Sequence, residues 1–337
     1  MIDKHITGSL YRPEFEHDAC GVGFIANSNG KREHRILDFA LQSLCRLSHR
    51  GALDADGITG DGAGVLTQIP AEFFLKIAEE LGDAPESADE LGVGMFFLPG
   101  KDTEAASKCV ALVDQVATEL EVTRIGWRNV PVDTSCLGEK ALETRPEIRQ
   151  LLVKRSVGWN LEEFERRLFL LRKICEKRAT EAGLKDFYIP SFSARTIVYK
   201  GMFDAPQLGK FFLDLQDESY TTALAVYHQR YSTNTFPNWK LAHPFRTIAH
   251  NGEINTLLGN KNWMRAREKE MRSSLWGDNV ELLKPIIQDA NSDSGCLDNA
   301  LEMLTMSGRS VLHAAMMLCP EAWEKMDEMP PKIKAFY

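Results

Sequence analysis

The sequence has no long hydrophobic run, no clustered cysteines and no excess of basic residues. No run approaches the ~20 apolar residues that span a bilayer, and residues 1–19 contain no apolar core of a secretory signal. The seven cysteines stand far apart. Even the nearest two, Cys296 and Cys319, are 23 positions apart, so zinc and iron–sulfur spacings are missing. Lys and Arg total 40 against 48 Asp and Glu, a net charge of −8 that disfavours nucleic acid. These features predict a cytoplasmic protein with no metal site, membrane association or nucleic-acid partner.

The order of the predicted elements favours an α+β fold. The chain has 337 residues, 44% of them hydrophobic, which suits one large domain or two smaller ones. Strands come in clusters separated by helical clusters, so layered α+β is favoured over a Rossmann sheet. Periodicity and composition predict strands at 20–27, 65–70, 91–99, 122–132, 186–202, 220–232 and 247–254, and helices at 35–47, 71–81, 102–120, 161–180, 254–272, 279–288, 294–306 and 310–318.

Cys20 is a candidate nucleophile at the start of a predicted buried strand. Most cysteines in such a place are small apolar core residues, and that interpretation stays open. A thiol needs a nearby base, and no His–Asp partner is evident close by in the sequence. If residues 1–19 were removed, the α-amine of Cys20 could take the thiol proton, because its pKa is close to neutral.

The segment 48–64, SHRGALDADGITGDGAG, is a loop rich in glycine and aspartate. It lacks both the P-loop and the dinucleotide-binding patterns, so nucleotide binding is not predicted. Arg50 either satisfies carbonyl groups at the end of the preceding helix or projects toward the loop that holds the Cys20 strand.

Arg230 ends a strong predicted strand, on the same face as Leu224, Val226 and His228. An arginine on an apolar face needs a partner, which is either a structural carboxylate or a ligand carboxylate gripped by two parallel hydrogen bonds.

Two polar turns follow. Asn251 and Gly252 form a common turn signal, but a side-chain amide beside a glycine N–H also suits the donors of an oxyanion hole. Asp293 or Ser294 could be the N-cap of the next helix, or Asp293 could accept a ligand ammonium.

Together these pieces resemble one family. The ordered phrases CGVGF, HRG, HQRYSTN, HNGEIN and SDS resemble the class II (Ntn-type) glutamine amidotransferases. The longer phrases DGITGDGAG, HPFRTIAHNGEINTLLGNKNWMRAR and SDSGCLDNALE are similar to the amino-terminal glutaminase domain of glutamate synthase large subunits. The resemblance covers most of the chain, from about residue 17 onward.

The resemblance implies roles for particular residues. Cys20 is the expected nucleophile, exposed when residues 1–19 are removed as a leader. Asn251 and Gly252 are the expected oxyanion donors. The expected glutamine-binding residues are Arg230 for the α-carboxylate, Asp293 for the α-ammonium, Tyr231 and Thr233 in the pocket, and Arg50 as a support of the nucleophile loop.

The resemblance also implies the fold and the setting. We expect a four-layer αββα sandwich with two mostly antiparallel sheets over residues 20–337, truncated at its C-terminal end, with residues 102–185 as an insertion. No cofactor is expected in this chain, while FMN and an iron–sulfur cluster are expected in the remainder of the parent enzyme. Expected partners are L-glutamine, the synthase region of the same polypeptide and a small NADPH-oxidising subunit. A plant-type source would place the protein in the plastid stroma.

Two alternative functions remain from the sequence. One is another Ntn-type amide hydrolase, which would cleave amides without an α-amino acid head group. The other is a catalytically silent scaffold domain, which would retain its leader.

Overall fold

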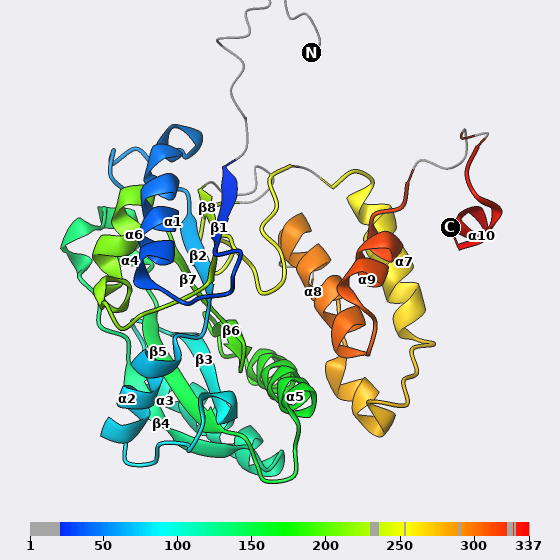
Figure 1. Ribbon diagram of the computed structural model, residues 1–337, viewed down its shortest axis with the longest axis horizontal. Helices are drawn as coiled ribbons and strands as arrows, with labels where there is room; N and C mark the ends of the chain where they lie inside the picture. The colour runs from blue at the N-terminus through cyan, green and yellow to red at the C-terminus, as the bar shows by residue number, and fades with distance from the viewer. Residues whose placement is uncertain are drawn as a thin grey trace, which may run out of the picture.

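The computed structural model describes residues 21–229, 236–252, 254–288, 291–321, 326 and 328–336. Its strands form two four-stranded sheets, ordered β1-β8-β2-β7 and β4-β5-β3-β6, and every pairing is antiparallel (Figure 1). The strands are β1 (Val22–Ala26), β2 (Ala63–Gln68), β3 (Leu91–Leu98), β4 (Thr123–Asn129), β5 (Glu147–Lys154), β6 (Tyr188–Ser193), β7 (Thr196–Gly201) and β8 (Leu224–Gln229).

Helices cover both sheets. Helices α1 and α6 contact the first sheet, and α3 and α5 contact the second. The α+β class with two antiparallel sheets is therefore confirmed, and the arrangement agrees with an Ntn-type sandwich. The helices are α1 (His34–Arg46), α2 (Ala71–Glu80), α3 (Thr103–Glu119), α4 (Glu139–Glu143), α5 (Leu161–Glu181), α6 (Ala205–Phe211), α7 (Leu257–Glu268), α8 (Asp293–Met306), α9 (Val311–Leu318) and α10 (Pro331–Phe336).

Strand β3 shows how the second sheet is buried on both faces. Val93, Met95 and Phe97 belong to a core shared with the first sheet, α1 and α6. Phe96 and Leu98 point to the opposite side and pack with α3 and α5. Because side chains alternate along a strand, a continuous apolar run of this kind fits only a strand with two covered faces.

Helix α5 confirms the clearest helix prediction. The Asn160 side chain caps its first turn by accepting a hydrogen bond from the Glu163 N–H at 2.9 Å. Leu168, Leu171 and Cys175 form its buried stripe. The same helix buries Arg172, which forms ion pairs with Glu176 of α5 and Glu302 of α8.

Three expectations about elements are wrong. The segment 102–185 is no insertion, because it supplies β4 and β5, half of the second sheet. Segment 247–252 forms no strand. The N–H groups of Thr247 and Ile248 donate to the Asp298 side chain, and the Ile248 carbonyl accepts from the Phe245 N–H in a turn. The predicted helix 279–288 is a 3₁₀ helix, Gly277–Leu283, followed by an irregular segment at Pro285, which lacks an N–H to continue it.

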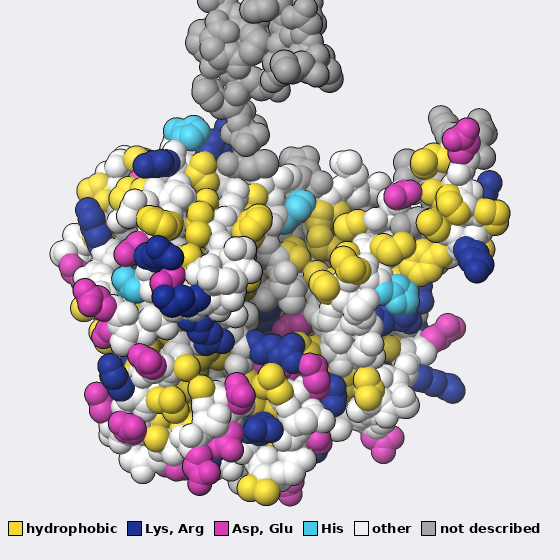
Figure 2. Space-filling model, viewed as in Figure 1, with side chains coloured by type: hydrophobic (Ala, Val, Ile, Leu, Met, Phe, Trp, Pro, Cys, Tyr) yellow, Lys and Arg dark blue, Asp and Glu magenta, His cyan; other side chains and the backbone are white. Residues whose placement is uncertain are grey.

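The C-terminal helices lie beside the sheets. Helix α8 packs on α5, and residues of both helices share one apolar core (Figure 1). Large hydrophobic side chains remain exposed on α7 and α9: Leu258, Trp263, Val311 and Leu312. The space-filling view shows hydrophobic side chains gathered on the right, where these two helices lie in Figure 1 (Figure 2). No helix in the described part of the chain combines the length and apolarity needed to cross a membrane.

Candidate active site

The site predicted from the sequence is only partly described by the structure. Cys20, Arg230, Tyr231 and Thr233 lie outside the described residues. Arg50, Asn251, Gly252 and Asp293 lie inside them.

The pairing of β1 with β8 continues to the residues next to Cys20 and Arg230 in the sequence. Val22 pairs with His228, and the Gln229 N–H donates to the Gly21 carbonyl at 2.6 Å. Cys20 is bonded to Gly21, and Arg230 is bonded to Gln229. The predicted nucleophile and the predicted carboxylate clamp thus each stand one residue beyond the same hydrogen-bonded pair.

The HRG turn packs against this end of β8. Arg50 is half-buried in the 3₁₀ turn Ser48–Arg50. A Cβ added to Gly51 would lie 2.0 Å from the Gln229 Nε2, so any larger residue here would have to displace the Gln229 amide. Gln229 is fully buried, and its side-chain amide has no hydrogen-bond partner among the described residues. The position agrees with the expected support of the nucleophile strand, and the role of Arg50 stays a prediction.

A cluster of histidines joins β8 to the segment before Asn251. The rings of His228 and His243 stack with centroids 4.5 Å apart. The His228 Nε2 lies 3.1 Å from the His250 carbonyl oxygen, and because a carbonyl only accepts, Nε2 carries the hydrogen. The His250 N–H donates to the His243 Nδ1 at 3.5 Å, which requires that nitrogen to be unprotonated. Burial also lowers the pKa of His243 well below its usual value, so both arguments give a neutral ring.

Asn251 and Gly252 follow directly. Asn251 is half-buried and Gly252 is exposed. Gly252 has φ +153°, a conformation that side chains rarely adopt. The nearest atom to an added Cβ would be 3.7 Å away, so backbone conformation rather than crowding favours glycine here.

The start of α8 brings Asp293 to this segment. Ser292 is the N-cap, accepting from the Gly295 N–H at 3.0 Å, so neither Asp293 nor Ser294 has that role. Asp293 is 3% exposed, and its Oδ2 accepts from the Ile254 N–H at 3.3 Å. The His250 Nδ1 lies 3.1 Å from the Ser294 Oγ. These two contacts join the segment that contains Asn251 and Gly252 to the start of α8, which contains Asp293, although about 40 residues separate them in the sequence.

A fully buried lysine, Lys200 of β7, lies beside Phe245, two residues before segment 247–252. Its Nζ is 3.3 Å from the Tyr188 hydroxyl and 4.5 Å from the centre of the Phe245 ring. Burial, reinforced by the charge of Arg246, lowers its pKa well below the usual value. Sequence reasoning missed Lys200, His243 and His250. The available signals were the His243-Pro244 and His250-Asn251-Gly252 motifs, but the sequence alone could not show that the His250 N–H bonds to the His243 ring.

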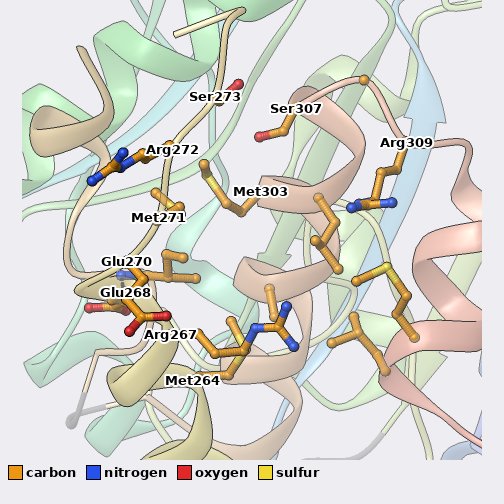
Figure 3. Close-up of a pocket in the computed structure, with 16 residues that line it drawn as sticks. Met264, Arg267, Glu268, Glu270, Met271, Arg272, Ser273, Met303, Ser307 and Arg309 are labelled. Carbon is orange, nitrogen blue, oxygen red and sulfur yellow. Dashed lines mark hydrogen bonds between the residues drawn. The ribbon is translucent and has the colours of Figure 1, made fainter. Parts of the chain in front are cut away.

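The cavity in Figure 3 lies elsewhere. It has a volume of about 640 Å³ and is lined by α7, the segment after it, the second half of α8, and α9. Met264, Met271 and Met303 line it together with Arg267, Arg272 and Arg309 (Figure 3). None of the predicted site residues is among its lining residues, so the geometry assigns it no part in the expected chemistry. Within the described ranges no group of His, Cys, Asp and Glu is arranged to hold a metal ion.

Comparison with known proteins supplies a family. The model of the family described as glutamine amidotransferases class-II matches residues 20–337. The chain is 45% identical over 330 residues to "Glutamate synthase [NADPH] large chain" of Azospirillum brasilense, covering 98% of this chain and 22% of that protein. It is 48% identical over 325 residues to "Ferredoxin-dependent glutamate synthase 2" of Synechocystis sp., covering 96% of this chain and 21% of that protein. The chain therefore spans about a fifth of the length of these relatives.

Proposed function

Because this chain belongs to the class-II glutamine amidotransferases, we propose that it hydrolyses the side-chain amide of L-glutamine with Cys20 as nucleophile. One observation carries the proposal. Asp293, a buried carboxylate, is hydrogen-bonded to the backbone three residues after Asn251, and the His250–Ser294 contact ties the same two segments. These two contacts support the proposal, because they link the residue proposed to bind the α-ammonium to the segment proposed to supply the oxyanion donors.

The reaction begins after residues 1–19 have been removed. The α-amine of Cys20 takes the thiol proton, and the sulfur attacks the δ-carbon of glutamine. The carbonyl oxygen becomes negatively charged and accepts hydrogen bonds from the Asn251 side chain and the Gly252 N–H. The proton returns to the leaving nitrogen, ammonia departs, and a thioester remains. Water then attacks the thioester, which releases glutamate and restores the thiol.

Specificity for glutamine needs one cation and one anion. Arg230 is proposed to grip the α-carboxylate through two parallel hydrogen bonds, and Asp293 is proposed to accept a hydrogen bond from the α-ammonium. Tyr231 and Thr233 are proposed to line the pocket, and Arg50 to support the nucleophile strand.

The larger setting is also a proposal. In the whole polypeptide, ammonia would pass to a synthase region and react with 2-oxoglutarate to give glutamate. The relatives' names include both NADPH and ferredoxin, so this domain is compatible with either electron donor. The seven cysteines have no cluster spacing, and we assign FMN and an iron–sulfur cluster to the remainder of the polypeptide. A small NADPH-oxidising subunit and a cytoplasmic location, or a plastid one in a plant-type source, complete the proposal.

The test is an intact mass before and after incubation with 6-diazo-5-oxo-norleucine, a glutamine-shaped electrophile. We expect the loss of residues 1–19 and one adduct on Cys20. Cys20→Ser is the matched control and should give no adduct and almost no glutamate release. Normal turnover by Cys20→Ser would refute the mechanism. A processed chain that takes no adduct would refute the glutamine pocket.

A further inference from the structure

A second aspartate of α8, Asp298, reaches the segment that carries the oxyanion donors. It stands five residues after Asp293 and is fully buried. Its Oδ1 accepts hydrogen bonds from the Thr247 N–H at 2.7 Å, the Thr247 hydroxyl at 2.7 Å and the Ile248 N–H at 3.2 Å. A carboxylate that accepts several such bonds holds its donors firmly, because hydrogen bonds to a charged group are stronger than neutral ones.

The other oxygen of Asp298 faces a buried arginine. Its Oδ2 lies 3.6 Å from the Arg246 Nη1. Arg246 in turn donates to Glu176 of α5 at 3.1 Å and to the Ile189 carbonyl of β6 at 2.7 Å. Asp298 is therefore itself fixed, through Arg246, to α5 and the second sheet.

The oxyanion pair is bracketed by two attachments to one helix. Upstream, Asp298 holds Thr247 and Ile248. Downstream, Asp293 holds Ile254. Since α8 is rigid and rises about 1.5 Å per residue, the two carboxylates keep a constant separation along it. Asn251 and Gly252 lie between the two attachment points.

We propose that Asp298 is a positioning residue for Asn251 and Gly252, which sets their distance from Asp293. The inference rests on the proposed function, because it assigns the oxyanion donors to these two residues. Donors of this kind act by being fixed before the charge develops. A misplacement of about 1 Å commonly costs on the order of 100-fold in rate. Loss of the upstream attachment should therefore reduce turnover more than binding of the head group.

The experiment uses the full chain after removal of residues 1–19, verified by mass, and compares two ligands. The first is a glutamine analogue in which an aldehyde replaces the amide. The Cys20 α-amine takes the thiol proton, the sulfur bonds to the aldehyde carbon as the C=O π bond opens, and the resulting oxyanion accepts hydrogen bonds from the proposed oxyanion donors. The second is glutamate, which forms no such adduct. For Asp298→Ala we expect kcat for glutamine to fall about 10- to 100-fold with KM within about threefold, and aldehyde affinity to fall at least tenfold more than glutamate affinity.

Glu302→Gln is the matched control. Glu302 is also a buried carboxylate of α8, but it bonds Arg172 of α5 and not the segment 247–252. Its substitution should lower stability without changing the ratio of aldehyde to glutamate affinity. A folded Asp298→Ala whose ratio stays within twofold of Glu302→Gln would overturn the proposal.

A milder pair of variants decides the question if Asp298→Ala does not fold. Thr247 is exposed, so Thr247→Val should fold while losing the hydroxyl bond to Asp298. Thr247→Ser keeps that hydroxyl. We expect the valine variant to lower the affinity ratio about threefold and the serine variant to leave it unchanged. Equal ratios would overturn the inference. A processed wild-type chain that does not hydrolyse glutamine would instead refute the proposed function.

Discussion

Replacing Lys200 by methionine should stabilise the protein. Lys200 is fully buried in β7, and its Nζ has the Tyr188 hydroxyl at 3.3 Å as a hydrogen-bond partner. The charges that reach it are opposed, because Arg246 lowers its pKa while Asp298 raises it, and burial is the larger influence. The Phe245 and Tyr188 rings would favour an ammonium. Burial outweighs these attractions and lowers the pKa of Lys200, so we expect the charged form to be disfavoured.

The size of the effect follows from two opposing contributions. Replacing a buried ion pair by well-packed apolar residues of similar volume is often neutral or stabilising by about 1–4 kcal/mol, and we apply the same range to the single buried amine of Lys200. Loss of the bond to the Tyr188 hydroxyl costs about 1 kcal/mol. We therefore expect Lys200→Met to raise the free energy of unfolding by about 2 kcal/mol at pH 7. At about 2 °C per kcal/mol for a chain of this size, the melting temperature should rise by about 4 °C.

Urea denaturation at several pH values is the assay. Above the folded-state pKa of Lys200 and below its unfolded-state value of 10.5, the unfolded chain binds a proton that the folded one does not. Stability of the wild type then rises with pH, by at most about 1.4 kcal/mol per pH unit. Methionine does not titrate, so the advantage of the variant should shrink as the pH approaches 10.5.

Two outcomes would refute this reasoning. A Lys200→Met protein that is less stable at pH 7 would show that the amine is well accommodated. A stability difference that does not change with pH would show that Lys200 stays protonated in the folded state. Lys101→Met is the control, because the Lys101 side chain is 72% exposed and its loss should change stability by less than about 0.5 kcal/mol.

Four further predictions concern the site. Asn251→Ala should lower kcat for glutamine about 100-fold or more with little change in KM, measured by glutamate release, and the reverse pattern would contradict an oxyanion role. Arg230→Ala should raise KM more than it lowers kcat in the same assay, and an unchanged KM would remove it from the head-group site. Gly51→Ala should lower the free energy of unfolding by about 1–3 kcal/mol in urea, because its Cβ would meet the buried Gln229 amide at 2.0 Å, and a neutral result would mean that Gln229 can move aside. Burial lowers the pKa of His243 in the folded state, so its neutral ring contributes stability that is present above pH 6.5 and lost as the pH falls further. His243→Gln should therefore make the free energy of unfolding depend less on pH in acid, and an unchanged pH dependence would count against a neutral His243.

The elements with a regular apolar period could be predicted from the sequence. Helix α5 and strand β3 follow from their side-chain spacing and from Asn160 as cap. Strand β5 was missed, because charged and polar residues interrupt its apolar positions. Segment 247–252 reads as a strand, but its N–H groups bond to Asp298 and its carbonyl at His250 to His228, contacts that no local pattern announces.

In the candidate site too, single residues could be predicted from the sequence but their contacts could not. Asn251, Gly252 and Asp293 could be named from short motifs and the resemblance. Their meeting could not be predicted, because it depends on how α8 packs against α5. Asp298 carries no sequence signal of its own, since an aspartate inside a helix is usually solvated. Only its complete burial and its three bonds distinguish it.

The pairing of β1 with β8 also constrains the order of events during synthesis. Val22 pairs with His228, which the ribosome adds 206 residues later. Contacts between residues that are far apart in sequence form late, because the entropy of closing a long loop is lost before these contacts stabilise the chain. Strand β1 is made first, yet its hydrogen-bonded neighbour β8 is the last strand of the two sheets in chain order. The proposed removal of residues 1–19, if it needs the β1–β8 pair, must therefore wait until every strand of the two sheets has been translated.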